Sequence, residues 1–264
     1  MLEVADLRIR VPGSGAPRYA VEDVGFRLRR GERLGLIGES GSGKSMTALA
    51  LMGLLPRGCT ATGSVRLDGT ELLTLDERSL RRIRGSRMAM VFQDVLTALN
   101  PLTRVGRHVA EPFRRHRGMG ASAAARAAAE LLERVGFPDP DTVARAYPAH
   151  LSGGQRQRVC LAMALACQPR VLIADEPTTA LDATVQAEIL DLLDRTLDTV
   201  TDQRPALLFV SHDLAVLARV CDHVLVLREG RVVERGPVQT LLRAPENEHT
   251  RALLADAREA AWNG

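Results

Sequence analysis

A chain of 264 residues with 45% hydrophobic and 25% charged residues has the composition of a globular domain. Its net charge of +3 and its 3% aromatic content do not favour nucleic-acid binding, which prefers a concentrated basic stripe with aromatics. The beginning of the chain lacks the pattern of a secretion signal, and no apolar run approaches the ~20 residues of a membrane span. We therefore expect any membrane role to depend on a partner protein.

The four cysteines are far apart or embedded in apolar runs, and none shows a CxxC spacing. Their positions predict neither a zinc site nor a redox pair. We expect buried free thiols in a reducing cytoplasm. The residues concerned are Cys59, Cys160, Cys167 and Cys221.

The first part of the chain has the pattern of β-strands around a helix. Val24, Phe26 and Leu28 alternate with glycine and arginine, which is the period of a half-buried strand. We predict strands over residues 2–10 and 20–29, joined by a Pro/Gly loop. The further predicted elements are a strand over 33–37, a helix over 46–52, a strand over 64–67, a helix over 77–83 and a strand over 88–92.

A helical block interrupts the alternation of strands and helices. Residues 105–147 are predicted to be mostly helical, and their alanine-rich part is explained by helix propensity. Continuous apolar runs at 171–175 and 207–210 suit a parallel sheet that helices cover on both faces. Residues 223–234 suit a hairpin, and the chain after Pro237 is predicted to be helical. The pattern predicts an α/β fold with an inserted helical subdomain.

Residues 38–45 fit the phosphate-binding pattern G-x-x-x-x-G-K-[ST] between a predicted strand and a predicted helix. Its glycines let backbone N–H groups point at phosphates, and the following helix N-terminus favours an anion. Lys44, the only lysine of the chain, is predicted to reach the β- and γ-phosphates, and the Ser45 hydroxyl to hold Mg²⁺. The predicted nucleotide-binding residues here are Gly38, Glu39, Ser40, Gly41, Ser42, Gly43, Lys44, Ser45 and Met46.

Two adjacent carboxylates end the apolar strand at 171–175. Ligands of open α/β folds bind at the carboxyl ends of the strands. Asp175 is therefore predicted to hold Mg²⁺ through water, and Glu176 to act as general base. The alternative is that acidic residues merely end the strand. The phosphate loop earlier in the chain favours the functional interpretation.

A second glycine-rich stretch, Leu151-Ser152-Gly153-Gly154-Gln155, precedes a predicted helix over 156–167. Ser152 is a good helix cap, and the stretch is either a second anion site or a cap alone. The order LSGGQRQR followed by VLIADEP resembles the signature region of ATP-binding cassette (ABC) ATPases, and the resemblance covers nearly the whole chain. It implies that residues 151–155 of one subunit face the phosphate loop of the other, with two ATP molecules held in a head-to-tail dimer.

The same resemblance implies roles for single residues elsewhere. Gln93 matches the glutamine that contacts Mg²⁺ and the attacking water, and His212 matches the switch histidine that contacts the γ-phosphate. Asp182, in Ala180-Leu181-Asp182, matches a segment that couples the two sites, although it also suits a helix cap. Adenine usually stacks on an aromatic near the end of the first strand, where Val11 stands, so Tyr19 is the nearest candidate.

Within the family, residues 84–101 and 174–182 resemble peptide and nickel importers. Two features depart from these importers. Val95 stands where they usually carry proline, and residues 247–254 match their C-terminal tail only in part. The sequence lacks their longer cysteine-bearing extension, and this shorter form is similar to nickel and metallophore subunits. The resemblance implies an ATPase that powers uptake of peptides or nickel or metal chelates. It implies a second ATPase subunit, identical or paralogous, two membrane permeases and an extracytoplasmic binding protein, with the chain at the cytoplasmic face of the membrane. The alternatives are an exporter ATPase and a soluble ABC protein of translation or DNA repair.

The predicted domain plan is a single ABC ATPase domain, a P-loop NTPase with a mainly parallel core sheet and an antiparallel β subdomain. Residues 1–93 and 161–235 form the nucleotide-binding core, 94–160 the inserted helical subdomain, and 236–264 a helical tail. We expect the helical subdomain to dock a membrane subunit. The apolar candidates for the docking contact are Leu96, Leu99, Pro101 and Leu102, and the alternative is that they pack inside the block.

Overall fold

The computed structural model describes residues 1–13, 17–179, 181–198 and 204–262, and it divides into two compact units. Unit 1 comprises Met1–Leu80 and Ala206–Gly264, and unit 2 comprises Arg81–Pro205. The predicted subdomain boundaries after residues 93, 160 and 235 remain predictions. None of the helices in the described ranges is both long enough and apolar enough to cross a membrane.

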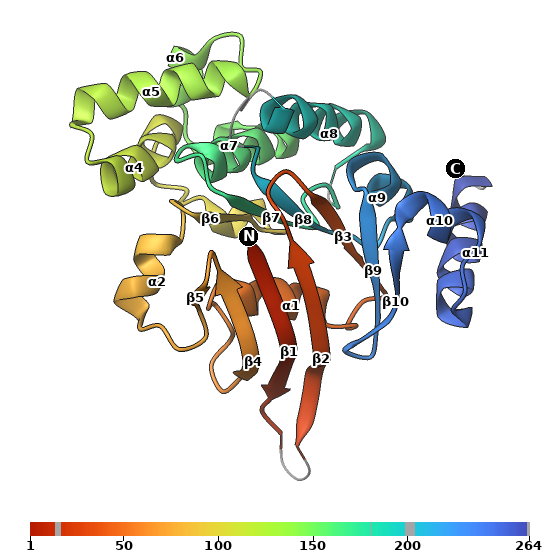
Figure 1. The fold of residues 1–264 in the computed structure, drawn as a ribbon. Helices are drawn as coiled ribbons and strands as arrows, with labels where there is room; N and C mark the ends of the chain where they lie inside the picture. Colours follow the sequence, from red (N-terminus) through yellow and green to blue (C-terminus); the bar gives the residue numbers. More distant parts are fainter. Residues whose placement is uncertain (14–16, 180, 199–203, 263–264) are drawn as a thin grey trace. The chain divides into compact units, whose positions relative to one another are not determined.

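Unit 1 contains a four-stranded sheet in the order β2-β1-β4-β5, whose described pairs are antiparallel (Figure 1). It forms because alternate residues of β1, among them Leu2 and Val4, are apolar and buried. Register shifts lie next to Asp6, which has a left-handed φ of 51°. This sheet confirms the predicted antiparallel part. Its strands are β1 (Leu2–Val11), β2 (Arg18–Leu28), β4 (Thr60–Leu67) and β5 (Thr70–Glu71).

The parallel strands of unit 1 carry the phosphate loop. β3 pairs in parallel with β8 and with β9, and β10 forms the predicted hairpin with β9. All residues of β8 are buried, as its continuous apolar sequence predicts. These strands are β3 (Arg33–Ile37), β8 (Ala206–Val210), β9 (His223–Arg228) and β10 (Arg231–Pro237).

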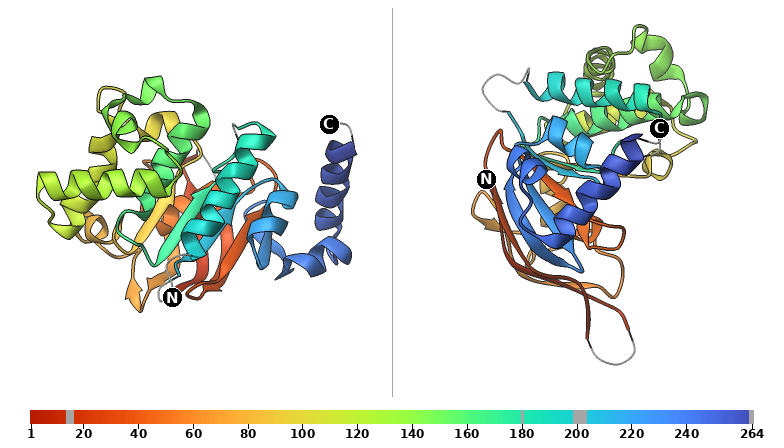
Figure 2. Two further views of the ribbon diagram at one scale, coloured as in Figure 1. Left: turned by 90° about the horizontal axis from the view of Figure 1, so that it is seen from above. Right: turned by 90° about the vertical axis from the view of Figure 1, so that its right-hand side faces the viewer.

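In the described part of unit 1, four helices lie wholly within the unit. α1 packs on β1 and β2, α10 packs on β10, and α11 packs on α9 (Figure 2). The predicted helical tail after Pro237 is confirmed as α10 and α11. The bounds are α1 (Lys44–Leu51), α9 (Leu214–Val220), α10 (Val238–Arg243) and α11 (Glu248–Trp262). Helix α2 (Glu77–Ile83) spans the boundary between the two units.

Unit 2 combines a parallel strand pair with the predicted helical block. β6 (Met88–Val91) pairs in parallel with β7 (Val171–Asp175). In α4 and α5, apolar residues at helical spacing, such as Val105 and Val109, are buried where these helices pack together. The helices of the unit are α3 (Val95–Ala98), α4 (Val105–Arg117), α5 (Ala121–Arg134), α6 (Pro140–Arg145), a 3₁₀ turn (Pro148–His150), α7 (Gly153–Leu165) and α8 (Ala183–Asp198).

The predicted docking residues differ in exposure. Leu99 is 2% exposed, so the prediction that it faces a partner is wrong, and the alternative of packing inside the unit holds for it. Leu102 is 86% exposed, and Pro101 beside it is also exposed. The side chain of Leu96 lies outside the described part of the chain. An apolar run in a loop does not reveal which of its residues turn inward, because packing decides this.

Candidate nucleotide-binding site

The phosphate loop lies between β3 and α1 in unit 1 and is held by hydrogen bonds among its own residues. The Lys44 side chain is 5% exposed, and its Nζ donates to the carbonyl oxygens of Gly38 at 2.7 Å and Glu39 at 2.9 Å. The backbone N–H of Ser42 donates to the Glu39 carbonyl at 3.2 Å. The Lys44 ammonium group thus bonds to two neutral carbonyl oxygens of the loop. A phosphate bound in the loop would offer it a charged and therefore stronger acceptor.

Two glycines of this loop are required by close backbone contacts. A Cβ at Gly43, whose φ is 103°, would lie 2.5 Å from the carbonyl oxygen of Ala20. A Cβ at Gly38 would lie 2.2 Å from the carbonyl oxygen of Leu227. At Gly41, by contrast, a Cβ would meet no atom within 4 Å, so the tip of the loop is open. The narrow base and open tip suit a loop that wraps a ligand.

The loop also holds an unsatisfied polar atom. Ser42 Oγ is buried and has no hydrogen-bond partner among the described residues. Such a group costs free energy unless a ligand or water satisfies it. Glu39 and Ser40 are exposed, whereas Ser45 and Met46 are half-buried in the first turn of α1. The loop therefore fits an anionic ligand on this observation as well as on its sequence.

His212 follows β8 in unit 1, at the same sheet edge as the phosphate loop that follows β3. β3 and β8 are parallel, with Leu36 opposite Val210, and the Ser211 N–H donates to the Leu36 carbonyl at 3.2 Å. The next residue but one, Asp213, caps α9 by accepting from two backbone N–H groups. His212 is exposed between these two anchors. Its neighbours hold its backbone at the carboxyl edge of the sheet, and contact of its side chain with the γ-phosphate remains a prediction.

Tyr19 lies on β2, opposite Arg10, and is 40% exposed. The carbonyl of the next residue, Ala20, is the atom that faces Gly43 at the base of the phosphate loop. An aromatic ring at this position is therefore one residue from a backbone contact with the loop. Stacking of adenine on Tyr19 remains a prediction.

The carboxylates of unit 2 sit at the end of β7 as predicted. Asp175 is 5% exposed, and Glu176 follows it with a φ of 45°, in the left-handed region that few non-glycine residues adopt. Such a conformation persists only where the surrounding structure imposes it, and it is common at functional sites. The β6–β7 pairing places Val91 opposite Ala174, which brings the segments after both strands to one edge.

Two side chains hold the Glu176 carboxylate. Gln93 Nε2 donates to Glu176 Oε2 at 3.1 Å, and Thr179 Oγ1 donates to the same oxygen at 3.0 Å. The predicted glutamine and the predicted base are therefore in direct contact. Thr179 was not among the predicted residues, and a hydroxyl three residues after the carboxylate was the signal in the sequence. Both donors orient the carboxylate, which is what a general base requires.

The signature stretch is built as a capped helix start. Ser152 Oγ accepts from the Gln155 N–H at 3.2 Å, and Gln155 Oε1 accepts from the Ser152 N–H at 2.9 Å. This capping box explains why α7 begins at Gly153, three residues before the predicted start. Ser152 and Gly153 are exposed, whereas Leu151 is buried. A role toward a second subunit remains a prediction.

Gly154 brings α7 close to the start of α8. A Cβ there would lie 2.4 Å from Val185 Cγ1, so only glycine fits without movement. Asp182 accepts from the Val185 N–H at 3.0 Å and caps α8, which confirms the cap interpretation. Ala180 of the predicted coupling segment lies outside the described residues. Val185 therefore lies against Gly154 of the signature stretch and is also hydrogen-bonded to Asp182.

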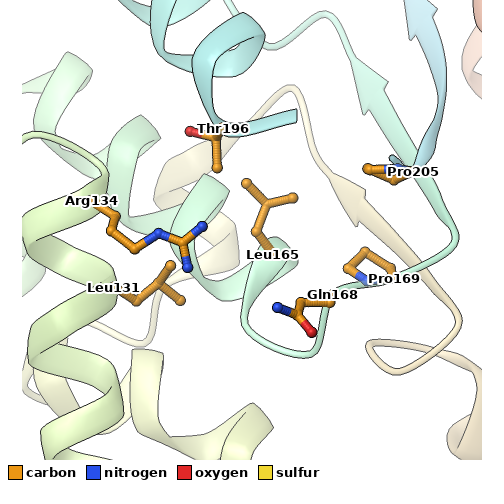
Figure 3. Close-up of a pocket in the computed structure, with 7 residues that line it drawn as sticks. All are labelled: Leu131, Arg134, Leu165, Gln168, Pro169, Thr196 and Pro205. Carbon is orange, nitrogen blue, oxygen red and sulfur yellow. The ribbon is translucent and has the colours of Figure 1, made fainter. Parts of the chain in front are cut away.

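Unit 2 also has a small pocket lined by residues of α5, α7 and α8 and of the segments beside them (Figure 3). Leu131 and Leu165 supply apolar walls, and Arg134 lies at its side. The Thr196 hydroxyl already donates to the Leu192 carbonyl at 2.7 Å. None of the predicted site residues lines this pocket. Within the described ranges, no three His, Cys, Asp or Glu side chains are grouped to hold a metal ion.

Residues 21–179 match the family described as ABC transporter. The chain belongs to the ABC transporter family. It is 44% identical over 254 residues to the oligopeptide transport ATP-binding protein OppD of Salmonella typhimurium, with 96% of this chain and 75% of that protein covered. It is 41% identical over 262 residues to the dipeptide transport ATP-binding protein DppD of Haemophilus influenzae, with 99% and 78% covered.

This ABC ATPase also matches part of a longer protein and two solved structures. It is 45% identical over 257 residues to the peptidoglycan transport ATP-binding protein YejF of Agrobacterium fabrum, and spans 46% of that protein and 97% of itself. The dimeric structure of a bacterial ABC transporter cassette covers 90% of this chain and 99% of its own, with a TM-score of 0.79 and 30% identity. A dimeric post-hydrolysis cassette bound to ADP and Pi matches with a TM-score of 0.79 and 29% identity, at the same coverage.

Proposed function

We propose that this chain is the ATP-binding and ATP-hydrolysing subunit of a bacterial ABC importer that takes up peptides. The ATPase activity is inferred mainly from the phosphate loop. There the only lysine of the chain, Lys44, is buried and donates to the loop carbonyls of Gly38 and Glu39. The names of the relatives, which are peptide, dipeptide and oligopeptide transport subunits, support import and the cargo. Nickel or a metal chelate is the second candidate cargo, supported by the resemblance of residues 84–101 and 174–182 and by the partly matching tail at 247–254.

Binding of ATP begins with Lys44. Its ammonium group leaves the carbonyls of Gly38 and Glu39 for the β- and γ-phosphates, which are stronger acceptors because they are charged. The loop N–H groups and the N-terminus of α1 then face the phosphates. Tyr19 on β2 is the residue that we propose to stack on adenine.

Hydrolysis depends on Glu176. Its carboxylate accepts a proton from water as the water oxygen attacks the γ-phosphorus, and ADP leaves. Gln93 and Thr179 donate to Oε2 and so hold the carboxylate in place. His212 is the proposed contact of the γ-phosphate. Mg²⁺ arriving with ATP would be held by oxygen atoms of Ser45, Asp175 and Gln93, donors that this ion prefers, and would neutralise phosphate charge.

We also propose that two such subunits, either two copies or a pair of paralogues, form a head-to-tail dimer. The exposed Ser152 and Gly153 of one subunit would contact ATP on the loop of the other. Asp182 would couple the two sites. Both solved relatives are described as dimeric cassettes, which supports this arrangement.

Transport requires permease subunits, because the described part of this chain offers no spanning helix. We propose that unit 2 docks one of two permeases at the cytoplasmic face of the membrane, through a surface that includes Pro101 and Leu102. Leu102 is 86% exposed and Pro101 beside it is also exposed, so the two side chains are accessible to a partner helix. An extracytoplasmic binding protein would deliver the cargo.

Purification with natural partners and a transport assay test this function. Two permeases in the purified complex, and ATP-dependent uptake of peptides into proteoliposomes, are the expected results. Uptake of nickel chelates without peptides would correct the cargo. Outward transport would instead support an exporter, and recovery with ribosomes or DNA would support a soluble ABC protein.

A further inference from the structure

A histidine of the C-terminal helix contacts the phosphate loop. His249 lies in the first turn of α11, and its side chain is 5% exposed. Its Nδ1 is 3.7 Å from Oε1 of Glu39, the second residue of the loop. This separation is longer than a hydrogen bond, and the contact is an ion pair when the imidazole is protonated. The ATP-binding scheme above makes no use of it.

The position of His249 is set by contacts that do not involve nucleotide. The Glu234 carboxylate of β10 accepts from the N–H groups of Glu246 at 2.9 Å and Asn247 at 3.1 Å. Burial alone would raise the pKa of Glu234, but hydrogen bonds, these two among them, hold it below its ordinary value. Asn247 Oδ1 in turn accepts from the His249 N–H at 2.9 Å. The start of α11 is therefore anchored to the β9–β10 hairpin.

In the described part of the chain, the buried imidazole of His249 lacks a hydrogen-bond partner at one of its ring nitrogens. Its Nε2 is buried and has no hydrogen-bond partner among the residues that the structure describes. Leaving a buried ring nitrogen unpaired costs free energy, so packing considerations alone would favour an apolar residue here. The Glu39 carboxylate lies beside the other ring nitrogen, Nδ1. The contact with the loop thus gives a physical reason for a histidine at this place.

Glu39 connects this contact to the nucleotide site. Its side chain faces His249, while its backbone carbonyl accepts from Lys44 Nζ at 2.9 Å and from the Ser42 N–H at 3.2 Å. Fixing the side chain of Glu39 restricts the backbone that carries these bonds. A loop with fewer conformations loses less entropy when it orders around phosphates.

We propose that His249 is a positioning residue for ATP binding, which holds Glu39 and thereby keeps the phosphate loop in its binding conformation. The proposal rests on the proposed role of that loop. Glu39 is 70% exposed, so water screens the pair and the effect is modest. Loss of the contact is expected to weaken ATP affinity by about two- to fivefold.

The test is a double-mutant cycle in the full-length protein with His249→Gln, Glu39→Gln and the double variant. ATP affinity is measured by titration calorimetry, and KM and kcat by steady-state phosphate release. We expect each single variant to raise Kd and KM about two- to fivefold with a smaller change in kcat, and the double variant to be no worse than either single one. His223→Gln, at an exposed histidine of β9, is the matched control and should behave as the wild type.

Three results would overturn the proposal. They are unchanged Kd in Glu39→Gln, unchanged Kd in His249→Gln, and additive losses in the double variant. Glu39→Gln alters an exposed side chain, so it decides the matter even if His249→Gln does not fold. Lys44→Ala separates this inference from the function on which it rests. If Lys44→Ala binds ATP like the wild type, the loop assignment fails; if it loses ATP while the two Gln variants bind normally, only the role of His249 fails.

Discussion

Replacement of Glu176 by glutamine tests the basicity of the proposed proton acceptor separately from its geometry. The glutamine side chain has nearly the same shape, and its Oε1 can still accept from Gln93 Nε2 and Thr179 Oγ1, which lie 3.1 and 3.0 Å from Oε2 of Glu176. The left-handed φ of 45° disfavours both residues alike. The substitution therefore leaves the geometry in place and removes the basicity.

Loss of a general base costs about 10²–10⁴-fold in rate, which corresponds to about 3–5 kcal/mol of transition-state stabilisation. Glu176→Gln should accordingly bind ATP normally, hydrolyse it at least ~100-fold more slowly, and accumulate an ATP-bound dimer. Phosphate release at saturating ATP and size-exclusion chromatography with ATP measure the two effects. Glu133→Gln, at an exposed carboxylate of α5, is the control. Hydrolysis by Glu176→Gln within twofold of the wild type would refute the reasoning.

Three further predictions concern the loop, the signature and the docking surface. Lys44→Arg should abolish or severely weaken ATP binding although charge is kept, because a planar fork replaces a slim ammonium; near-normal affinity in calorimetry would contradict this. Gly154→Ala should lower the free energy of unfolding by about 1–3 kcal/mol, since its Cβ would meet the Val185 side chain at 2.4 Å, and urea denaturation measures it. Leu102→Glu should keep ATP affinity but lose co-purification with the permeases and transport.

Matched variants make two of these outcomes specific. A Cβ at Gly153 would lie 3.5 Å from Leu181, an ordinary contact, so Gly153→Ala should unfold at nearly the wild-type urea concentration. Leu99→Glu buries a charge at a site that is 2% exposed and should destabilise the protein rather than its docking alone. If Gly153→Ala proves as unstable as Gly154→Ala, or if Leu102→Glu still transports, the corresponding assignment is wrong.

The sequence by itself predicted the features that depend on neighbours along the chain. The strand at 171–175 and the helix at 77–83 agree with the observed bounds, because their period and composition are local properties. The phosphate loop is recognised for the same reason, since eight consecutive residues contain its glycines, its lysine and its hydroxyl. The order of the later motifs was sufficient to indicate the family, which the comparisons confirm.

Tertiary structure decided the contacts between residues that are distant in sequence. Gln93 and Glu176 are 83 positions apart, and their hydrogen bond exists because β6 and β7 run in parallel and end at one edge. The burial of Leu99 beside the exposed Leu102 likewise depends on the packing of unit 2 and not on hydropathy, which is the same for both. His249 meets Glu39 only because the anchored start of α11 returns to the loop. Local pattern determines each element, whereas the free energy of packing elements together selects which side chains meet.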